Sequence, residues 1–534
     1  MNKIYYLLLI FISYLFSEHR CGFYENNLIN IQRSRPNLDM FKFSPTGHFK
    51  IHYDTLGIDA PSLIDNNNNN IPDYIDEVGL IADSSRYVLV DLMGFNAEID
   101  DNDNIYDIYI EDKGPGSYGF TAFDDEDIIG ASYMLIDNEY EESDYYTSGI
   151  NTMRLTVAHE FFHAIQRSYR AYPNLDTRFF YEMSSTWIED VLVPDGNDYL
   201  YWTDDFFDDV DQDIDDTDGY SIALFGHYLT QVVEQEENQI SSSIIKEIWE
   251  EFENINNAHT SINNVLINRN TNFIQSWIDF CAKNLYNGTY SNMDNDVYYY
   301  IDQVDAQPIS KNSILLNQNQ DINQVIINDK SIAPLLSYEV ENFYIMTVTH
   351  LIDNSDFFGL LSLKRGDQVD QYIINNNIQF SLEQNDEVNF FYGSENNSQL
   401  IDINFNLEDC DISSLPTGIC DCLGNVLDDC GVCNGTNDCF PDEIQLLSVY
   451  PNPLYTPYYN KVNINYEIPE EMHVKLSIYN LNGQLLYVLY DGIQKGQENP
   501  YHYFWYPNNI SSGLYFINLL TNSYNRSYPI TILN

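Results

Sequence analysis

Residues 155–166 read Leu-Thr-Val-Ala-His-Glu-Phe-Phe-His-Ala-Ile-Gln and are the most informative stretch of the chain. The run contains neither Gly nor Pro, which predicts a continuous helix. His159 and His163 are four positions apart on the same face of that helix, so both imidazoles can reach one metal ion at about 2.0–2.1 Å. The spacing predicts a metal site on a buried helix, and two ordinary core histidines are the alternative interpretation.

Glu160 follows the first histidine and lies one step round the helix. Zinc lowers the pKa of a bound water towards neutrality, and a carboxylate beside that water can accept its proton. Glu160 is therefore the predicted catalytic base of a hydrolase. An oxyanion that develops in the transition state also needs a donor, and Tyr220 or His227 in a later helix-like stretch are candidates.

A catalytic zinc ion needs a third protein ligand. The next predicted helix, residues 179–192, places Glu182 and Glu189 on one face because they are seven positions apart, so either could complete the site. Glu189 and Asp190 are also candidates for a second, outer role, in which a carboxylate accepts the free N–H of a ligating histidine.

Two segments, residues 158–166 and 181–190, resemble a family of secreted bacterial zinc metalloproteases of the gluzincin class. Residues 47–53 and 71–76 match as well, so the likeness spans about residues 47–230. The resemblance implies an α+β zincin-type domain, a catalytic zinc ion (Zn2+), protein or peptide substrates, and Glu182 as the third ligand. Gluzincins commonly carry Gly after that glutamate, whereas this chain has Met183. A catalytically silent surface adhesin on a peptidase scaffold is the alternative function.

Residues 65–76 follow the calcium-loop scheme of EF-hands. Oxygen-bearing ligands fall at the expected loop positions, with a backbone carbonyl at the seventh: Asp65, Asn67, Asn69, Ile71, Asp73 and Asp76. Asn70 stands where Gly usually makes the sharp turn, but Asn tolerates the left-handed backbone required there. The loop predicts a structural calcium ion (Ca2+), and an Asn-rich turn without a ligand is the alternative.

The charge of the chain excludes one large class of partners. The chain carries 82 acidic and 23 basic residues, a formal net charge of −59, which repels nucleic acid. Residues 1–17 combine Lys3 with an apolar run, as in a secretory signal peptide. No later stretch approaches the roughly 20 apolar residues of a spanning helix, so we expect an exported chain without a transmembrane segment.

Six cysteines fall within residues 409–440, a segment with almost no apolar residues: Cys410, Cys420, Cys422, Cys430, Cys433 and Cys439. In an exported protein this pattern predicts a connector held by disulfides, and a zinc knuckle is the alternative. Their pairing does not follow from the sequence.

The remaining chain indicates several domains. Residues 18–46 are expected to be an N-terminal extension or propeptide, residues 47–300 the catalytic domain, and residues 301–408 a β-rich, sandwich-like domain. Alternating residues after 440 predict a terminal Ig-like β-sandwich. Motifs at 449–453, 478–483 and 512–516 make residues 441–534 resemble a type IX secretion C-terminal sorting domain, which implies the type IX machinery as a partner and export across the outer membrane.

Overall fold

The computed structural model describes residues 35–533, apart from positions 115, 125–129, 141–145, 171–175, 237, 293–294, 296, 351–356, 375–376, 396–398, 412–414, 417, 428–432, 434–443, 451, 453, 456–460, 470, 482, 497–500, 508–509, 512 and 523. The expected signal peptide, most of the expected N-terminal extension, Cys430 and Cys439 lie outside the described residues.

A five-stranded sheet comes first along the described chain, with the order β1-β2-β3-β5-β4. Three central strands run parallel, and an antiparallel strand closes each edge. β1 lies before residue 47, so the sheet begins inside the segment expected to be an N-terminal extension. The strands are β1 (Met40–Phe43), β2 (Phe49–Tyr53), β3 (Tyr106–Glu111), β4 (Gly119–Phe123) and β5 (Ser132–Asp137).

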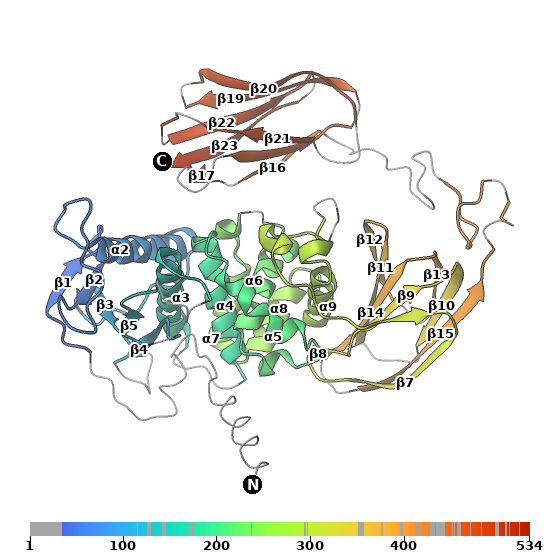
Figure 1. Ribbon diagram of the computed structural model, residues 1–534, viewed down its shortest axis with the longest axis horizontal. Coiled ribbons are helices and arrows are strands. Elements are labelled where there is room, and N and C mark those ends of the chain that lie inside the picture. Colours follow the sequence, from blue (N-terminus) through green and yellow to red (C-terminus); the bar gives the residue numbers. More distant parts are fainter. Residues whose placement is uncertain are drawn as a thin grey trace, which may run out of the picture. The chain divides into compact units, whose positions relative to one another are not determined.

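Two long helices, α3 (Ile150–Tyr169) and α4 (Arg178–Leu192), pack against each other, and α3 also packs on β4 and β5 (Figure 1). α3 is buried around most of its circumference, so it has no solvated face. It contains the stretch predicted to be a buried helix, and it occupies the centre of this part of the molecule. α2 (Asp73–Arg86), which continues as a π-helix, η2 (Tyr87–Leu92), packs beside α3.

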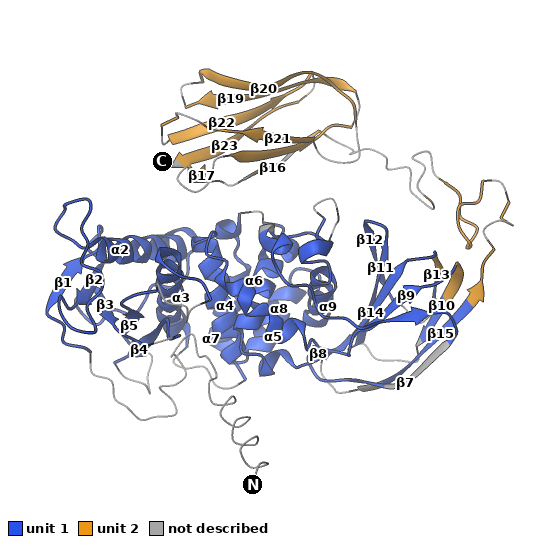
Figure 2. Ribbon diagram, in the orientation of Figure 1, with its two compact units in different colours: residues 1–342, 347–379, 383–407 blue, residues 343–346, 380–382, 408–534 orange. Residues whose placement is uncertain are grey.

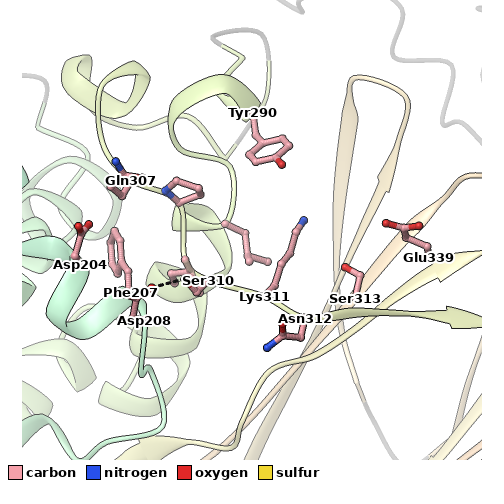
Figure 3. Close-up of a pocket in the computed structure, with 13 residues that line it drawn as sticks. Asp204, Phe207, Asp208, Tyr290, Gln307, Ser310, Lys311, Asn312, Ser313 and Glu339 are labelled. Carbon is pink, nitrogen blue, oxygen red and sulfur yellow. Dashed lines mark hydrogen bonds between the residues drawn. The ribbon is translucent and has the colours of Figure 1, made fainter.

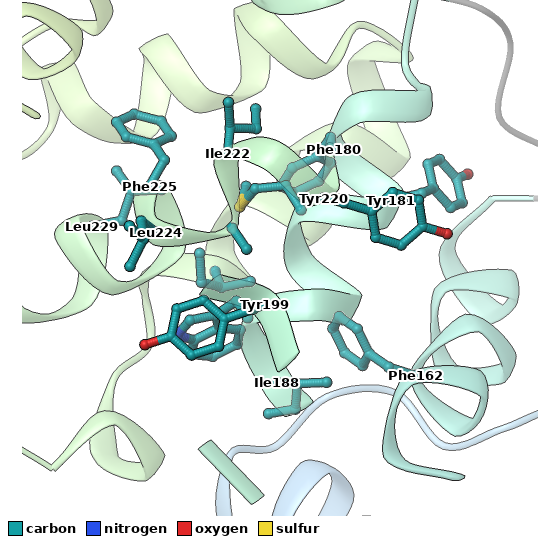
Figure 4. Packing of buried hydrophobic residues seen from close by; sticks show 14 of the residues in the cluster. Phe162, Phe180, Tyr181, Ile188, Tyr199, Tyr220, Ile222, Leu224, Phe225 and Leu229 are labelled. Carbon is teal, nitrogen blue, oxygen red and sulfur yellow. The ribbon is translucent and has the colours of Figure 1, made fainter. Parts of the chain in front are cut away.

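Short helices follow α4 and enclose a core rich in aromatic residues. Figure 4 shows Phe162 of α3, Phe180 of α4 and Phe225 of α6 within this cluster. Each fully buried aromatic or aliphatic side chain contributes on the order of 1.5–3 kcal/mol. The helices are η3 (Asp198–Tyr201), α5 (Thr203–Phe207), η4 (Ile214–Asp216), η5 (Tyr220–Ile222), α6 (Ala223–Tyr228), η6 (Leu229–Val233), η7 (Gln239–Ser241), α7 (Ile244–Ile255), α8 (Ala258–Ile267), α9 (Phe273–Asn284), η8 (Gly288–Tyr290) and η9 (Ile301–Val304).

Two further sheets form the β-rich region predicted between residues 301 and 408. Their orders are β13-β10-β15-β7 and β12-β11-β14-β9-β6, with β8 paired to β14. The strands are β6 (Ser313–Leu316), β7 (Gln320–Ile327), β8 (Ser331–Ile332), β9 (Leu336–Val340), β10 (Tyr344–His350), β11 (Phe357–Arg365), β12 (Gln368–Ile373), β13 (Asn377–Leu382), β14 (Glu387–Ser394) and β15 (Gln399–Asp409).

The C-terminal region has two sheets of its own around a separate hydrophobic core, in agreement with the predicted β-sandwich. Their orders are β16-β18-β21 and β17-β23-β22-β19-β20. The strands are β16 (Gln445–Tyr450), β17 (Leu454–Tyr455), β18 (Val462–Glu467), β19 (Met472–Asn480), β20 (Leu485–Gln494), β21 (Tyr501–Trp505), β22 (Gly513–Leu520) and β23 (Asn525–Leu533).

The contacts divide the chain into two compact units, coloured in Figure 2. One comprises residues 1–342, 347–379 and 383–407, and the other comprises residues 343–346, 380–382 and 408–534. Disulfides join Cys410 to Cys422 and Cys420 to Cys433 in the connector, which confirms the disulfide prediction for these four cysteines. Within the described part of the chain, no helix is both long and apolar enough to span a bilayer. The multidomain prediction, with mixed helices and sheets followed by β-sandwich regions, is confirmed at this level.

Candidate metal centre

His159 and His163 extend from the same side of α3, as their spacing predicts. Their ring centroids are 4.7 Å apart and the ring planes are nearly perpendicular, at 83°. Both side chains are almost fully buried. One helix turn thus presents two imidazoles to a common point in the interior.

Glu182 on α4 supplies a carboxylate at that point. Its Oε2 lies 3.1 Å from Nε2 of His159 and 3.5 Å from Nε2 of His163. One ligand atom from each of the three residues lies within 4.8 Å of the others. Because Glu182 is also fully buried, the three side chains form a polar cluster in the interior, beside the aromatic core.

The electrostatics of this cluster favour a positive charge beside the carboxylate of Glu182. Burial alone would raise the pKa of Glu182, but the charge of His163 and the hydrogen bond from His159 outweigh burial and hold this pKa far below its usual range. Burial alone would lower the pKa of His159, but hydrogen bonds to Glu182 and Glu189 raise it to about 9. A proton or a metal ion can provide that positive charge.

The donor set also fits zinc. Two imidazoles and one carboxylate form the His2Glu set of catalytic zinc sites. The second carboxylate oxygen of Glu182, Oε1, is buried and receives no hydrogen bond from any described residue. A buried oxygen without a donor is costly, and a cation at this site would remove that cost.

Glu189 contacts the opposite ring nitrogen of the first histidine. Its Oε1 lies 2.5 Å from Nδ1 of His159. Helix spacing allowed either glutamate to be the third ligand. In the structure the two have different positions, because Glu182 lies on the Nε2 side of the His159 ring and Glu189 lies on its Nδ1 side. A carboxylate that accepts Nδ1–H fixes the tautomer with Nε2 as the lone-pair donor, so Glu189 occupies the predicted outer position.

Gln166 accepts the Nδ1–H group of His163, as Glu189 does for His159. The sequence analysis did not identify this role. Oε1 of Gln166 lies 2.7 Å from Nδ1 of His163, and its Nε2 donates to the carbonyl of Tyr181 at 3.0 Å and to Ser185 Oγ at 2.9 Å. Because Nε2 is committed as a donor, Oε1 must accept, and His163 carries its proton on Nδ1. The three-residue spacing from His163 to Gln166 was a usable signal, since such pairs share a helix face.

Asp190 lies elsewhere than predicted for an outer carboxylate. Its Oδ2 is 3.6 Å from Nε2 of His227, while Nδ1 of His159 contacts Glu189 and Nδ1 of His163 contacts Gln166. Adjacent helix positions differ by about 100° in direction, so Asp190 cannot share the orientation of Glu189. Burial lowers the pKa of His227 to about 4, and this ring packs against that of Tyr199 at 5.3 Å.

Glu160, the predicted base, is held by the edge strand β4. The hydroxyl of Thr121 lies 2.9 Å from Oε2 of Glu160 and 2.6 Å from the Glu160 carbonyl oxygen. Both residues are buried. Thr121 had no signal in the sequence, because it is distant along the chain and belongs to a different element.

Tyr220, the candidate donor to an oxyanion, lies next to His159. Its ring is stacked on that of His159, with centroids 5.9 Å apart and planes at 13°. The preceding residue, Gly219, has φ +93°, and a Cβ there would lie 2.4 Å from the Phe179 carbonyl oxygen and 2.7 Å from Cβ of Glu182. Only glycine permits this approach of the η5 turn to α4, so Gly219 sets the position of Tyr220.

The candidate calcium loop is closed by hydrogen bonds among its own residues. Asp65 accepts from the backbone N–H groups of Asn69, at 3.2 Å, and Asn70, at 2.9 Å. Asp76 Oδ2 accepts from the side-chain amides of Asn67, at 3.1 Å, and Asn69, at 2.7 Å. Asn70 has φ 66°, the left-handed backbone expected at that loop position.

Asp73 is the first residue of α2 and contacts Asn66 at the start of the same loop. Its carboxylate accepts a hydrogen bond from the Asn66 side-chain amide at 2.6 Å. Among the described residues, no backbone N–H of a turn or loop donates to the carbonyl of Ile71. Three further carboxylates, those of Asp100, Asp101 and Asp103, also lie within 4.8 Å of one another near the sheet, but Asp101 is paired with Arg35 at 2.7 Å.

A separate pocket of about 720 Å³ is shown in Figure 3 and contains none of the predicted site residues. Its one lysine, Lys311, is paired with Glu387. The lining residues are Asp204, Phe207, Asp208, Leu285, Tyr290, Gln307, Pro308, Ile309, Ser310, Lys311, Asn312, Ser313 and Glu339.

Comparison with known families identifies the C-terminal region. Residues 448–532 match the family model described as a secretion system C-terminal sorting domain. The chain carries a type IX sorting domain. The sorting domain indicates export across the outer membrane, to a secreted or cell-surface location, and implies the secretion machinery.

No match was found among curated proteins. Among solved structures, the chain is similar to the full extracellular region of zebrafish Gpr126/Adgrg6, with 8% identity and a TM-score of 0.14, over 40% of this chain and 31% of that one. It is also similar to β-glucuronidase from Ruminococcus gnavus (10% identity, TM-score 0.12, 39% and 35% covered) and to the BSP domain of a biofilm-associated protein (9%, 0.13, 41% and 52%). The chain thus spans about half or less of the length of these structures, and the low TM-scores carry no functional argument.

Proposed function

We propose that this exported protein is a zinc-dependent endopeptidase, with zinc held by His159, His163 and Glu182. The observation that carries the proposal is the convergence of these three buried side chains from two packed helices. The two histidines also have partners on Nδ1 that leave Nε2 for a metal ion. A core formed for packing alone would not need this arrangement of polar atoms.

When bound there, zinc would supply a Lewis acid that acidifies water and polarises a peptide carbonyl. Glu160 follows His159 on α3, and it is the carboxylate available to accept the proton of the attacking water and to return it to the leaving amine. The hydroxyl of Thr121 positions that carboxylate. Tyr220, stacked on His159, is the phenol best placed to donate a hydrogen bond to a developing oxyanion.

The substrate class follows from the strand that carries Thr121. β4 is an edge of its sheet and, among the described strands, pairs only with β5. The strand is buried from Gly119 to Ala122, so addition of an extended peptide at its outer edge is itself part of the proposal. A peptide bound there would run past Thr121 and so past Glu160, which favours an endopeptidase over hydrolases of small molecules.

We further propose that the loop of residues 65–76 holds a structural calcium ion. Its carboxylates and amides already converge through the hydrogen bonds to Asp65 and Asp76. A calcium ion would draw the amide oxygens of Asn67 and Asn69 inwards in place of their nitrogens, since the two ends of an amide differ little in shape.

The test is metal analysis of the purified protein, combined with casein digestion by the wild type and by Glu160→Gln. One zinc per chain in both proteins and loss of casein cleavage in the variant are expected, because the amide cannot accept a proton. Equal cleavage by both proteins would refute the mechanism. Absence of zinc from a folded wild type reconstituted with the metal would refute the metal centre.

A further inference from the structure

Strand β20 (Leu485–Gln494) is an open edge of the sorting domain. It is the last strand of the sheet β17-β23-β22-β19-β20 and pairs antiparallel with β19. Within the described part of the domain, no strand pairs with its other edge. With 10 residues, it offers an edge roughly 34 Å long at about 3.4 Å per residue.

The side chains of β20 are apolar and exposed to an unusual degree. Four consecutive residues are 38–49% exposed, and Ile493 is 66% exposed. A bulge at Leu486 interrupts the regular alternation of the strand, so the apolar side chains of this stretch are exposed beside the open edge without strict alternation. The four are Leu485, Leu486, Tyr487 and Val488.

Natural edge strands are usually protected from pairing by charged residues, prolines or a covering element. β20 contains no proline and one charged residue, Asp491. That carboxylate is paired with Lys475 at 3.1 Å and His473 at 3.2 Å on β19, so its charge is largely balanced. The strand therefore lacks a free charge and a proline as protection, and two bulges in its pairing with β19 are the protective feature that it has.

The charge of the domain differs from that of the rest of the chain. Residues 448–532 contain four basic and five acidic side chains, a net charge of −1, whereas the whole chain carries −59. Nearly all the negative charge thus lies outside the sorting domain. An apolar partner can approach this domain without the electrostatic and desolvation cost that the acidic regions would impose.

We propose that β20 is the surface through which the secretion machinery recognises this chain. The occupant is an exposed, apolar β-strand edge of an outer-membrane component of that machinery, which adds to the sheet next to β20. Backbone hydrogen bonds along the strand would provide affinity, and burial of the apolar side chains of Leu485 to Val488 would provide specificity. The family match supplies the partner, since a sorting domain acts by being recognised. The proposal is independent of the peptidase activity.

The full chain, expressed in a bacterium that has type IX secretion, allows the test. Leu486→Lys and Val488→Lys place a charge on β20, and Leu520→Lys is the matched control. Leu486 and Leu520 are both 38% exposed, but Leu520 belongs to β22, which is paired on both sides. The measurement is the ratio of exported to periplasmic protein by immunoblot. A fall of about tenfold or more is expected for the β20 variants and no change for the control.

A second variant covers the case in which lysine disturbs folding. Val488→Thr keeps the β-branched shape and strand propensity but reduces apolar contact, so it should fold and still lower export. Thermal melting of each purified chain reports folding. Wild-type export of folded Val488→Lys, or of folded Val488→Thr where the lysine variant does not fold, would overturn the proposal. Equal loss with Leu520→Lys would do the same. A dimer in solution that Val488→Thr dissociates without affecting export would show that a second copy occupies the strand instead.

Discussion

Replacing Gln166 by methionine should weaken zinc binding by roughly 10- to 100-fold, the usual effect of removing the outer partner of a ligating histidine. Gln166 is fully buried, and its side chain accepts from His163 Nδ1 while donating to the Tyr181 carbonyl and to Ser185. Methionine preserves the approximate volume but makes none of these hydrogen bonds. The Nδ1–H group and the Tyr181 carbonyl would be left buried without this partner, at a cost of about 1–3 kcal/mol each.

Gln166→Glu is the matched control, because it separates the two ends of the side chain. A carboxylate keeps the acceptor for His163 but replaces the donor to the Tyr181 carbonyl with an oxygen. It should therefore lose stability while keeping most of the zinc affinity. Zinc affinity is measured by competition with a chromophoric chelator, and stability by urea unfolding with and without zinc. Unchanged zinc affinity in a folded Gln166→Met protein would refute the assigned role.

Three further outcomes are expected. Thr121→Val removes the hydrogen bond to Glu160 Oε2 and should lower kcat/KM for casein peptides by about tenfold without changing the zinc content; a fall in zinc content would instead indicate a structural role. The pKa of His227 is about 4 in the folded protein, below its usual value of 6.5, so the unfolded chain binds the additional proton between these values and stability should decline as the pH falls from 6.5 to 4. Over that interval His227 should account for a loss of roughly 3 kcal/mol, and His227→Phe should lose correspondingly less in urea unfolding at pH 7 and pH 4.5. Asp65→Ala and Asp73→Ala should lower the melting temperature in millimolar calcium with the zinc content retained, whereas unchanged melting curves would contradict calcium binding at this loop.

Part of the candidate metal centre could be predicted because its residues are close in the chain. Helix periodicity alone places His159 and His163 on one face, and the structure has them there with ring centroids 4.7 Å apart. The same periodicity could not distinguish Glu182 from Glu189 as the third ligand, since residues seven apart share a helix face. The position and rotation of α4 relative to α3 determine which carboxylate lies beside the Nε2 atoms, and side-chain packing from many parts of the chain sets that geometry.

The disulfide connector also combines a feature that the sequence predicts with one that only the fold decides. Composition predicted disulfides within residues 409–440, and the pairs Cys410–Cys422 and Cys420–Cys433 are present. Their pairing depends on the path of the backbone, which a list of cysteine positions does not contain. The edge strand β20 was not singled out in the sequence, and its position at the end of a sheet follows only from the strand pairing.

The helix with two histidines on one side, the acidic character, the β-rich regions and the sorting motifs can be read from the chain alone, because each depends on residues that are near one another in it. The resemblance to gluzincins pointed to Glu182, but the folded chain was needed to place its carboxylate beside the Nε2 atoms of both histidines. The contacts of Gln166 and Glu189 with the Nδ1 atoms, of Thr121 with Glu160, and of Asp190 with His227 likewise follow only from the fold. Each of these contacts requires a distance of a few ångströms between separate side chains, and that distance is fixed only when whole elements pack together.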